Sequence, residues 1–189
     1  MNWKLLTLAI SLLIAGSAAA QKNRRYTGRL NGGLLFGESR DFGQLHLVNG
    51  LRTKKWTAGA GAGIDWYYLR SVPVYASASR DLFSKKHSTV SLFGNLGYNL
   101  PWVEERMSNG LYQTGDNHRG GLYWSADIGY TYRLGKSRHG LLFSVGYSYK
   151  RMSEELSYVY PCLVPPCNPV VERFDYRMRR LSVQLGWIF

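Results

Sequence analysis

Residues 181–189 read LSVQLGWIF, and the alternation of apolar and polar side chains in this stretch decides the fold. Its odd-numbered residues are all apolar, whereas Ser182, Gln184 and Gly186 occupy three of the four even positions. Because successive side chains of a β-strand point to opposite faces, the stretch predicts a strand with one apolar face. An exposed strand of this kind would aggregate in water. We therefore expect its apolar face to meet lipid and both its edges to be paired in a closed barrel.

The same alternation recurs seven times earlier in the chain. In 56–68, its clearest example, large and small apolar residues alternate with glycines, which leave room for large side chains from opposite walls of a narrow barrel. In 73–82, Arg80 interrupts the apolar face, and we expect its charge to reach the headgroups at a membrane edge. The earlier strands are predicted at about 26–36, 43–52, 56–68, 73–82, 90–100, 122–134 and 141–150.

The connections between these strands alternate in length. Those after the second, fourth and sixth strands are short and basic, whereas those after the fifth and seventh are long polar segments, about 101–119 and 151–173. In outer-membrane barrels, short periplasmic turns alternate with longer external loops. The sequence therefore predicts an all-β fold, an eight-stranded antiparallel up-and-down transmembrane β-barrel with short periplasmic turns and longer extracellular loops. Both ends of the barrel domain would lie on the periplasmic side.

Aromatic side chains gather at both predicted edges of the apolar band, as expected of membrane interfaces. The periplasmic set is Trp56, Phe83, Tyr132, Trp187 and Phe189, and the outer set is Trp66, Tyr68, Tyr98, Trp102, Trp124 and Tyr149. A lipocalin-like soluble barrel is the competing fold, but it turns its apolar side inward. Here the face opposite the apolar one mixes glycine, serine, asparagine and charged residues, which are costly in an apolar cavity.

The whole chain after residue 20 resembles small outer-membrane barrels of the OmpA and OmpX kind. The stretches 61–65 and 70–75 also resemble a hairpin of the generic outer-membrane β-barrel domain family. In that family a final Phe, with a second aromatic two residues earlier, is read by the barrel assembly machinery, and Phe189 and Trp187 match these positions. Gln184 stands where the family tends to have glycine. The resemblance implies a bacterial outer-membrane location and the assembly machinery as a partner.

Residues 1–20 have the pattern of a cleaved secretory signal. A basic start precedes a short apolar run, and the segment ends in small residues. Cleavage between Ala20 and Gln21 would leave 21–189 as one barrel domain. The apolar run is too short to span a bilayer as a helix.

Charge and cysteine content agree with an exported protein. The formal net charge is +12, and for an exported chain we expect the partner to be outer-membrane lipid and lipopolysaccharide phosphate rather than nucleic acid. The only cysteines, Cys162 and Cys167, lie five apart, and we expect them to form a disulfide that closes a small loop.

An eight-stranded barrel has an interior that side chains can fill, so a wide pore is not expected. The inward-facing Asp65, Asp127, Lys150 and Arg180 could lie at similar heights in the outer half of the barrel. We expect them to form an ion-pair and hydrogen-bond network, since buried charges require partners. The alternative is a set of unconnected, solvated charges.

The sequence contains no set of nucleophile and base that indicates catalysis, and no metal or cofactor motif. Among the histidines, His46 is a mid-strand inward candidate, which we expect to be a satisfied interior polar residue rather than a base. The long loop after the seventh strand carries Tyr158, Tyr160, the cysteine pair and four prolines, which suits contact with a protein or glycan. The charged pairs 154–155 and 172–173 on its two sides suggest a hairpin that projects beyond the membrane. The alternative is a loop that the disulfide closes only for durability. We therefore expect a non-enzymatic barrel that acts structurally or in surface binding. The alternatives are an accessory subunit of an envelope secretion or uptake complex, and a lipid-modifying outer-membrane enzyme.

Overall fold

The structure is a computed structural model, and it describes residues 25–37, 40–66, 70–102, 113–135, 139–158, 168 and 170–189. Within these ranges no helix is long and apolar enough to cross a bilayer. The strands are β1 (Arg25–Phe36), β2 (Phe42–Thr53), β3 (Trp56–Asp65), β4 (Ser71–Ser84), β5 (Ser88–Pro101), β6 (Gln113–Arg119), β7 (Gly121–Arg133), β8 (Gly140–Tyr158) and β9 (Val170–Ile188).

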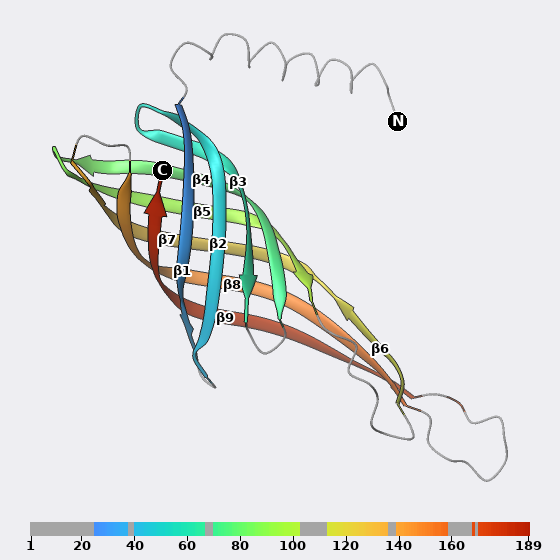
Figure 1. Cartoon of the computed structure of the whole chain (residues 1–189). Coiled ribbons are helices and arrows are strands. Elements are labelled where there is room, and N and C mark those ends of the chain that lie inside the picture. The colour runs from blue at the N-terminus through green and yellow to red at the C-terminus, as the bar shows by residue number, and fades with distance from the viewer. Residues whose placement is uncertain are drawn as a thin grey trace, which may run out of the picture.

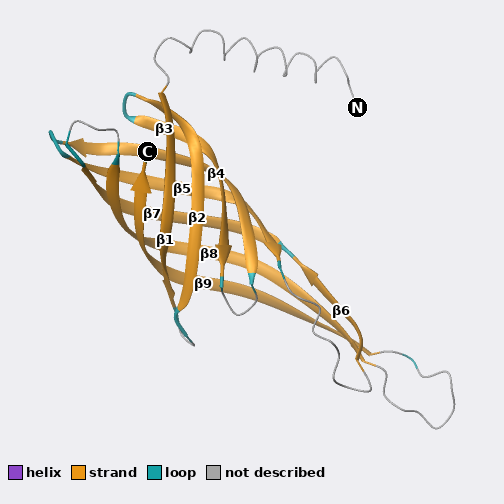
Figure 2. Cartoon of the chain, in the orientation of Figure 1, coloured by secondary structure: helices purple, strands orange, loops and turns teal. Residues whose placement is uncertain are grey.

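The strands form a closed antiparallel barrel (Figures 1 and 2). Each of β1 to β5 pairs with its neighbour in the chain, β5 pairs with β7, β7 with β8 and β8 with β9. The seam between β1 and β9, from Arg29↔Ile188 to Phe36↔Leu181, closes the ring. Eight strands therefore make up the wall, and β6 pairs only with the far part of β8. The predicted fold class is confirmed.

The two ends of the barrel differ. The end that carries Arg25 and Phe189, called the terminal end below, holds the short turns, including the two-residue turn at Lys54 and Lys55. Lys54 has a φ of 42°, which lies in the left-handed region that a tight hairpin turn requires. The opposite end, called the loop end, is where β6, β8 and β9 project past the other strands (Figure 1).

Two segments predicted as loops contain strand. β6 lies within 101–119, and β8 and β9 extend into 151–173 as far as Tyr158 and Val170. The register between β8 and β9 continues without a shift from Gly140↔Ile188 to Tyr158↔Val170. The strand β6 was not predicted, because 101–119 was taken as one long polar segment. The charged residues on both sides of the cysteine loop indicated a projecting hairpin, and the paired ends of β8 and β9 agree with that prediction. In the structure the charges pair across neighbouring strands, which stabilises an extended hairpin.

The wall has an apolar outside and a polar inside, as the alternation predicts. Outward residues such as Leu185 and Leu96 are 68% and 61% exposed, whereas the inward Ser182 and Asn99 are 0% exposed. On β3 the outward alanines alternate with inward glycines. A lipocalin-like barrel would show the opposite distribution. The outer surface is thus suited to lipid and poorly suited to water.

Exposed aromatic side chains occur at both ends of this surface. Trp56 and Phe83 are exposed near the terminal end, and Tyr98 and Trp102 near the loop end. Tyr68 lies outside the described residues. Arg80, which interrupts the apolar face of β4, points outward with its guanidinium carbon 5.3 Å from the centre of the Trp56 ring. The contact places a cation and an aromatic ring together at the terminal edge of the apolar band.

Candidate functional site

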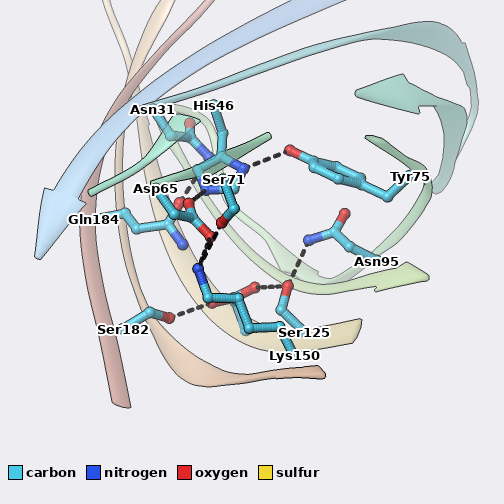
Figure 3. Close-up of polar contacts among 11 residues, drawn as sticks. Asn31, His46, Asp65, Ser71, Tyr75, Asn95, Ser125, Lys150, Ser182 and Gln184 are labelled. Atoms are coloured by element: carbon cyan, nitrogen blue, oxygen red, sulfur yellow. Dashed lines mark hydrogen bonds and ion pairs between the residues drawn. The ribbon is translucent and has the colours of Figure 1, made fainter. Parts of the chain in front are cut away.

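A chain of polar contacts crosses the barrel interior near the loop end (Figure 3). The Tyr75 hydroxyl lies 2.9 Å from Nδ1 of His46, whose Nε2 lies 3.0 Å from Oδ1 of Asp65. The other carboxylate oxygen of Asp65 accepts a hydrogen bond from Nζ of Lys150 at 3.3 Å, and the same nitrogen donates to Ser71 Oγ at 2.8 Å. All five residues are buried, so these contacts satisfy charges that would otherwise be costly in the interior.

A second group of contacts surrounds Asp127. Its two carboxylate oxygens accept hydrogen bonds from Ser182 Oγ at 2.8 Å and from Ser125 Oγ at 3.1 Å. Asn95 Nδ2 in turn donates to Ser125 at 2.8 Å. Ser125 lies on β7 with Asp127, whereas Ser182 comes from β9 and Asn95 from β5, so the Asp127 group links three strands of the wall.

Glycines on β3 make room for these side chains. A Cβ atom added at Gly61 would lie 2.5 Å from the Tyr75 ring and 2.9 Å from Val48, and one added at Gly63 would lie 2.5 Å from the His46 ring. Val48, Tyr75 and Tyr123 pack together as a small buried cluster beside the polar contacts. The glycine alternation noticed in the sequence therefore serves to admit a histidine and a tyrosine ring.

The interior narrows from the terminal end to the middle of the barrel. A cavity of about 60 Å³ in the terminal half is lined by small polar residues and by Arg29, Arg52 and Arg133, and Arg52 pairs with Asp81 there. At the level of His46 the cavity volume falls to about 10 Å³. The wider cavity has room for a few water molecules, whereas the narrow one has room for about one. The guanidinium of Arg29, 4.3 Å from the centre of the Phe93 ring, lies between the two.

We expected four residues to form one interior network, and the contacts described for them fall into three sets. Asp65 and Lys150 form an ion pair, and Asp127 bonds to serines. Arg180 donates from Nη1 to the backbone oxygen of Arg40 at 2.7 Å, toward the loop end. Sequence reasoning missed Tyr75, Ser71 and Ser182 as partners. In the sequence, the glycines of β3, such as Gly61, were the available indication that a large inward side chain of β4 lies beside them.

The projecting part of β8 and β9 has its own packing. Its inward face buries Met152 and Met178 against Leu35 of β1. Tyr176 packs against this cluster and donates from its hydroxyl to Glu154 at 2.9 Å. The hairpin is therefore anchored to the rim of the barrel by an apolar cluster.

The outward face of the projecting hairpin is charged. Arg173 lies 2.6 Å from Glu155, which also lies 3.3 Å from Arg119 of β6. Arg151 donates to both carboxylate oxygens of Asp175. The hydrogen bond from Arg151 holds the pKa of Asp175 below its ordinary value. Both groups are exposed, so water and salt screen the pair.

Of the remaining predicted sites, the two aromatic residues of the assembly signal lie in the described part of the chain, whereas the cleavage site and the cysteines do not. Phe189 pairs through its backbone with Gly28, and Trp187 pairs with Leu30 and Leu141 at the seam. Ala20, Gln21, Cys162 and Cys167 lie outside the described residues, so cleavage and the disulfide stay predictions. Within the described part of the chain, no three histidine, cysteine, aspartate or glutamate side chains gather where they could hold a metal ion.

Comparison with solved structures gives the class of fold. The crystal structure of neisserial surface protein A (NspA) is similar with a TM-score of 0.58 at 13% identity, over 88% of this chain and 98% of that one. The outer-membrane protein AlkL matches with a TM-score of 0.49 at 12% identity, over 88% of this chain and 90% of its own. OprG from Pseudomonas aeruginosa matches with a TM-score of 0.49 at 13% identity, over 87% and 95%.

The chain has the fold of a small eight-stranded outer-membrane barrel, and the resemblance expected from the sequence is confirmed at this level. No protein-family model matches the sequence. A search of curated proteins gives no match either.

Proposed function

We propose that this chain is a non-enzymatic integral protein of the bacterial outer membrane, which acts structurally or in surface binding through its projecting hairpin. The distribution of side chains on the wall supports the location. Outward residues of β8 are apolar or aromatic from Leu141 to Tyr149, and Arg151 follows. Nine residues of tilted strand match the ~25 Å height of an outer-membrane apolar band. Outer-membrane lipid and lipopolysaccharide are then the surroundings of the wall.

The orientation follows from the lengths of the connections. Short basic turns at the terminal end would lie in the periplasm, and the hairpin would project outside the cell. A signal peptide cleaved after Ala20 and recognition of Trp187 and Phe189 by the barrel assembly machinery belong to the same proposal.

The filled interior argues for a role other than diffusion or catalysis. His46 is 4% exposed, and both its ring nitrogens contact side chains, Tyr75 and Asp65. A general base needs access to a substrate proton, and this arrangement leaves little. The polar contacts instead connect strands on different sides of the wall, which favours a role in holding the barrel rigid.

The observation that carries the surface-binding role is the length of the hairpin. The β8–β9 register continues through nine residue pairs beyond Tyr149↔Arg179, well past the apolar band. A hairpin anchored by an apolar cluster loses little conformational entropy when it binds a protein or glycan ligand. A protein partner at this hairpin would make the chain an accessory subunit of an envelope secretion or uptake complex.

Cysteine labelling on intact cells tests location and orientation. In a Cys162→Ser/Cys167→Ser background, Glu172→Cys on the hairpin should react with a membrane-impermeant maleimide. Lys86→Cys at a terminal-end turn should react only after the outer membrane is opened. Equal labelling of both positions in intact cells would contradict the proposed orientation. Labelling of neither, with the protein found in a soluble fraction, would contradict the membrane location.

Shortening the hairpin tests the surface role. Ser153 and Asp175 face each other, so 154–174 can be replaced by an Asn-Gly turn without changing the register below. Placing Asn-Gly at Lys86 and His87, the two residues between the paired Lys85 and Ser88, gives a matched control at the other end. We expect loss of adhesion or of partner co-purification from native membranes in the shortened variant alone. If adhesion, co-purification and ligand uptake are all unchanged, the surface-binding role is wrong and only the structural role of the barrel remains.

A further inference from the structure

A cleft lies on the outer wall of the barrel, where the projecting hairpin leaves the apolar band. It has a volume of about 400 Å³, and its lining includes Tyr98, Leu122, Arg119, Arg151, Arg173 and Asp175. Tyr98 and Leu122 are exposed apolar residues of the lipid-facing surface. The three arginines are exposed above them. The cleft therefore has an apolar lower part and a cationic upper part.

A break between two strands creates the cleft. β6 ends at Arg119 and β7 begins at Gly121, and β6 pairs with β8 while β5 pairs with β7. At this break the chain passes so close to its neighbours that a Cβ at Gly120 would overlap the backbone oxygen of Asn99, and one at Gly121 would lie 2.7 Å from that of Arg151. Glycine is therefore required at both positions of the break, because any larger residue would press on the neighbouring strands.

Around the cleft, the positively charged side chains outnumber the negatively charged ones, so ion pairs within this face do not neutralise all of its arginines. Among the described residues of this face, five outward arginines, 119, 151, 173, 177 and 179, lie beside two outward acids, Glu155 and Asp175. The two hydrogen bonds from Arg151 to Asp175 use Nε and Nη2, which leaves its remaining donors available. Guanidinium groups bind phosphate oxygens in a bidentate geometry. The upper part of the cleft is thus complementary to an anion with several oxygens.

We propose that this cleft binds a phosphorylated glycolipid of the outer leaflet, of the lipid A class. Its phosphate lies among Arg119, Arg151 and Arg173, and an acyl chain lies against Tyr98 and Leu122. The inference rests on the proposed outer-membrane location, because only a lipid in that leaflet presents phosphate at this height. The apolar lower part selects a lipid over free phosphate, since a free anion would gain nothing from Tyr98 and Leu122.

Native mass spectrometry of the refolded protein in zwitterionic detergent tests the proposal. The probes are lipid A with two phosphates, the same lipid A with its phosphates removed, and inorganic phosphate. We expect the protein to bind the phosphorylated lipid about tenfold more tightly than the dephosphorylated one, because charge-assisted hydrogen bonds are lost with the phosphate. Equal binding of the two lipids overturns the proposal. Displacement of the lipid by inorganic phosphate at similar concentration overturns it as well.

Variants identify the cleft as the site. Arg119→Gln/Arg151→Gln should lower the affinity for phosphorylated lipid A to that for the dephosphorylated lipid, and Arg119→Lys/Arg151→Lys should recover part of it. Arg25→Gln/Lys55→Gln removes two exposed cations at the terminal end and should bind like wild type. Equal losses in the cleft and control variants overturn the assignment. The lipid comparison on wild type needs no variant to fold, and cysteine labelling on cells reports the location independently of lipid binding.

Discussion

Replacing Asp65 by asparagine should destabilise the barrel, because it removes one charge of a buried ion pair. Asp65 is 1% exposed, and its Oδ2 lies 3.3 Å from Nζ of Lys150, which is 2% exposed. At an effective dielectric constant of about 20, two unit charges at this distance attract by about 5 kcal/mol. Removing one partner of a buried pair costs about 3–5 kcal/mol. Since the asparagine amide can still accept one hydrogen bond, we expect the free energy of unfolding to fall by about 3 kcal/mol.

Urea unfolding of the protein refolded into phospholipid vesicles measures this loss, with tryptophan fluorescence and heat-modifiable gel migration as readouts. Asp175→Asn is the matched control, because Asp175 pairs with Arg151 on an exposed surface. Combining Asp65→Asn with Lys150→Met should recover much of the stability, since the second change removes the charge left without its carboxylate. A loss for Asp65→Asn no larger than that of Asp175→Asn would refute the reasoning.

Three further outcomes follow from the structure. Gly61→Ala should destabilise the barrel by about 1–3 kcal/mol, since the new methyl group would press on a buried tyrosine ring, whereas Gly94→Ala, which meets nothing within 4 Å, should be neutral in the same unfolding assay. Hydrogen bonding to Arg151 lowers the pKa of Asp175, so the contribution of this pair to stability should be complete at pH values above the ordinary aspartate pKa. That contribution should be lost as the pH falls through the lowered pKa of Asp175. In Arg151→Gln, carbon NMR titration should show a higher titration midpoint for Asp175. The two cysteines should resist alkylation until a reductant is added, and alkylation of unreduced, unfolded protein would show that they do not form a disulfide.

The wall of the barrel was predictable because an apolar outside and a polar inside impose the same local rule on every strand. Period-two alternation fixes which side chains face outward, and it identified the outward apolar face even on β4, despite Arg80. The lengths of the connections predicted that the short turns lie at one end of the barrel and the long loops at the other. The strand lengths beyond the apolar band were not predictable in this way, because outside the bilayer charged residues can form either loop or paired strand.

The interior contacts were only partly predictable. Alternation shows that Asp65, Asp127, Lys150 and Arg180 face inward, but their heights depend on the stagger between strands. That stagger brings Asp65 to Lys150 and leaves Arg180 beside Arg40 near the loop end. His46 was expected to be a satisfied interior residue, and it contacts Tyr75 and Asp65. Its partner Tyr75 comes from a strand two places away; the glycines of β3 show that there is room for two rings, but they do not specify which side chains meet.

The seam between β1 and β9 has a consequence for how the barrel is made. β9 follows all the other strands in the chain, yet it supplies the neighbours of both β1 and β8. Until it arrives, seven strands form an open gutter with two bare edges, and unpaired backbone groups at those edges cost several kcal/mol each in hydrocarbon. For the proposed outer-membrane location, we therefore expect such a gutter not to persist in the bilayer unaided, and insertion to be coupled to ring closure. Closure joins segments far apart in sequence, which favours slow folding.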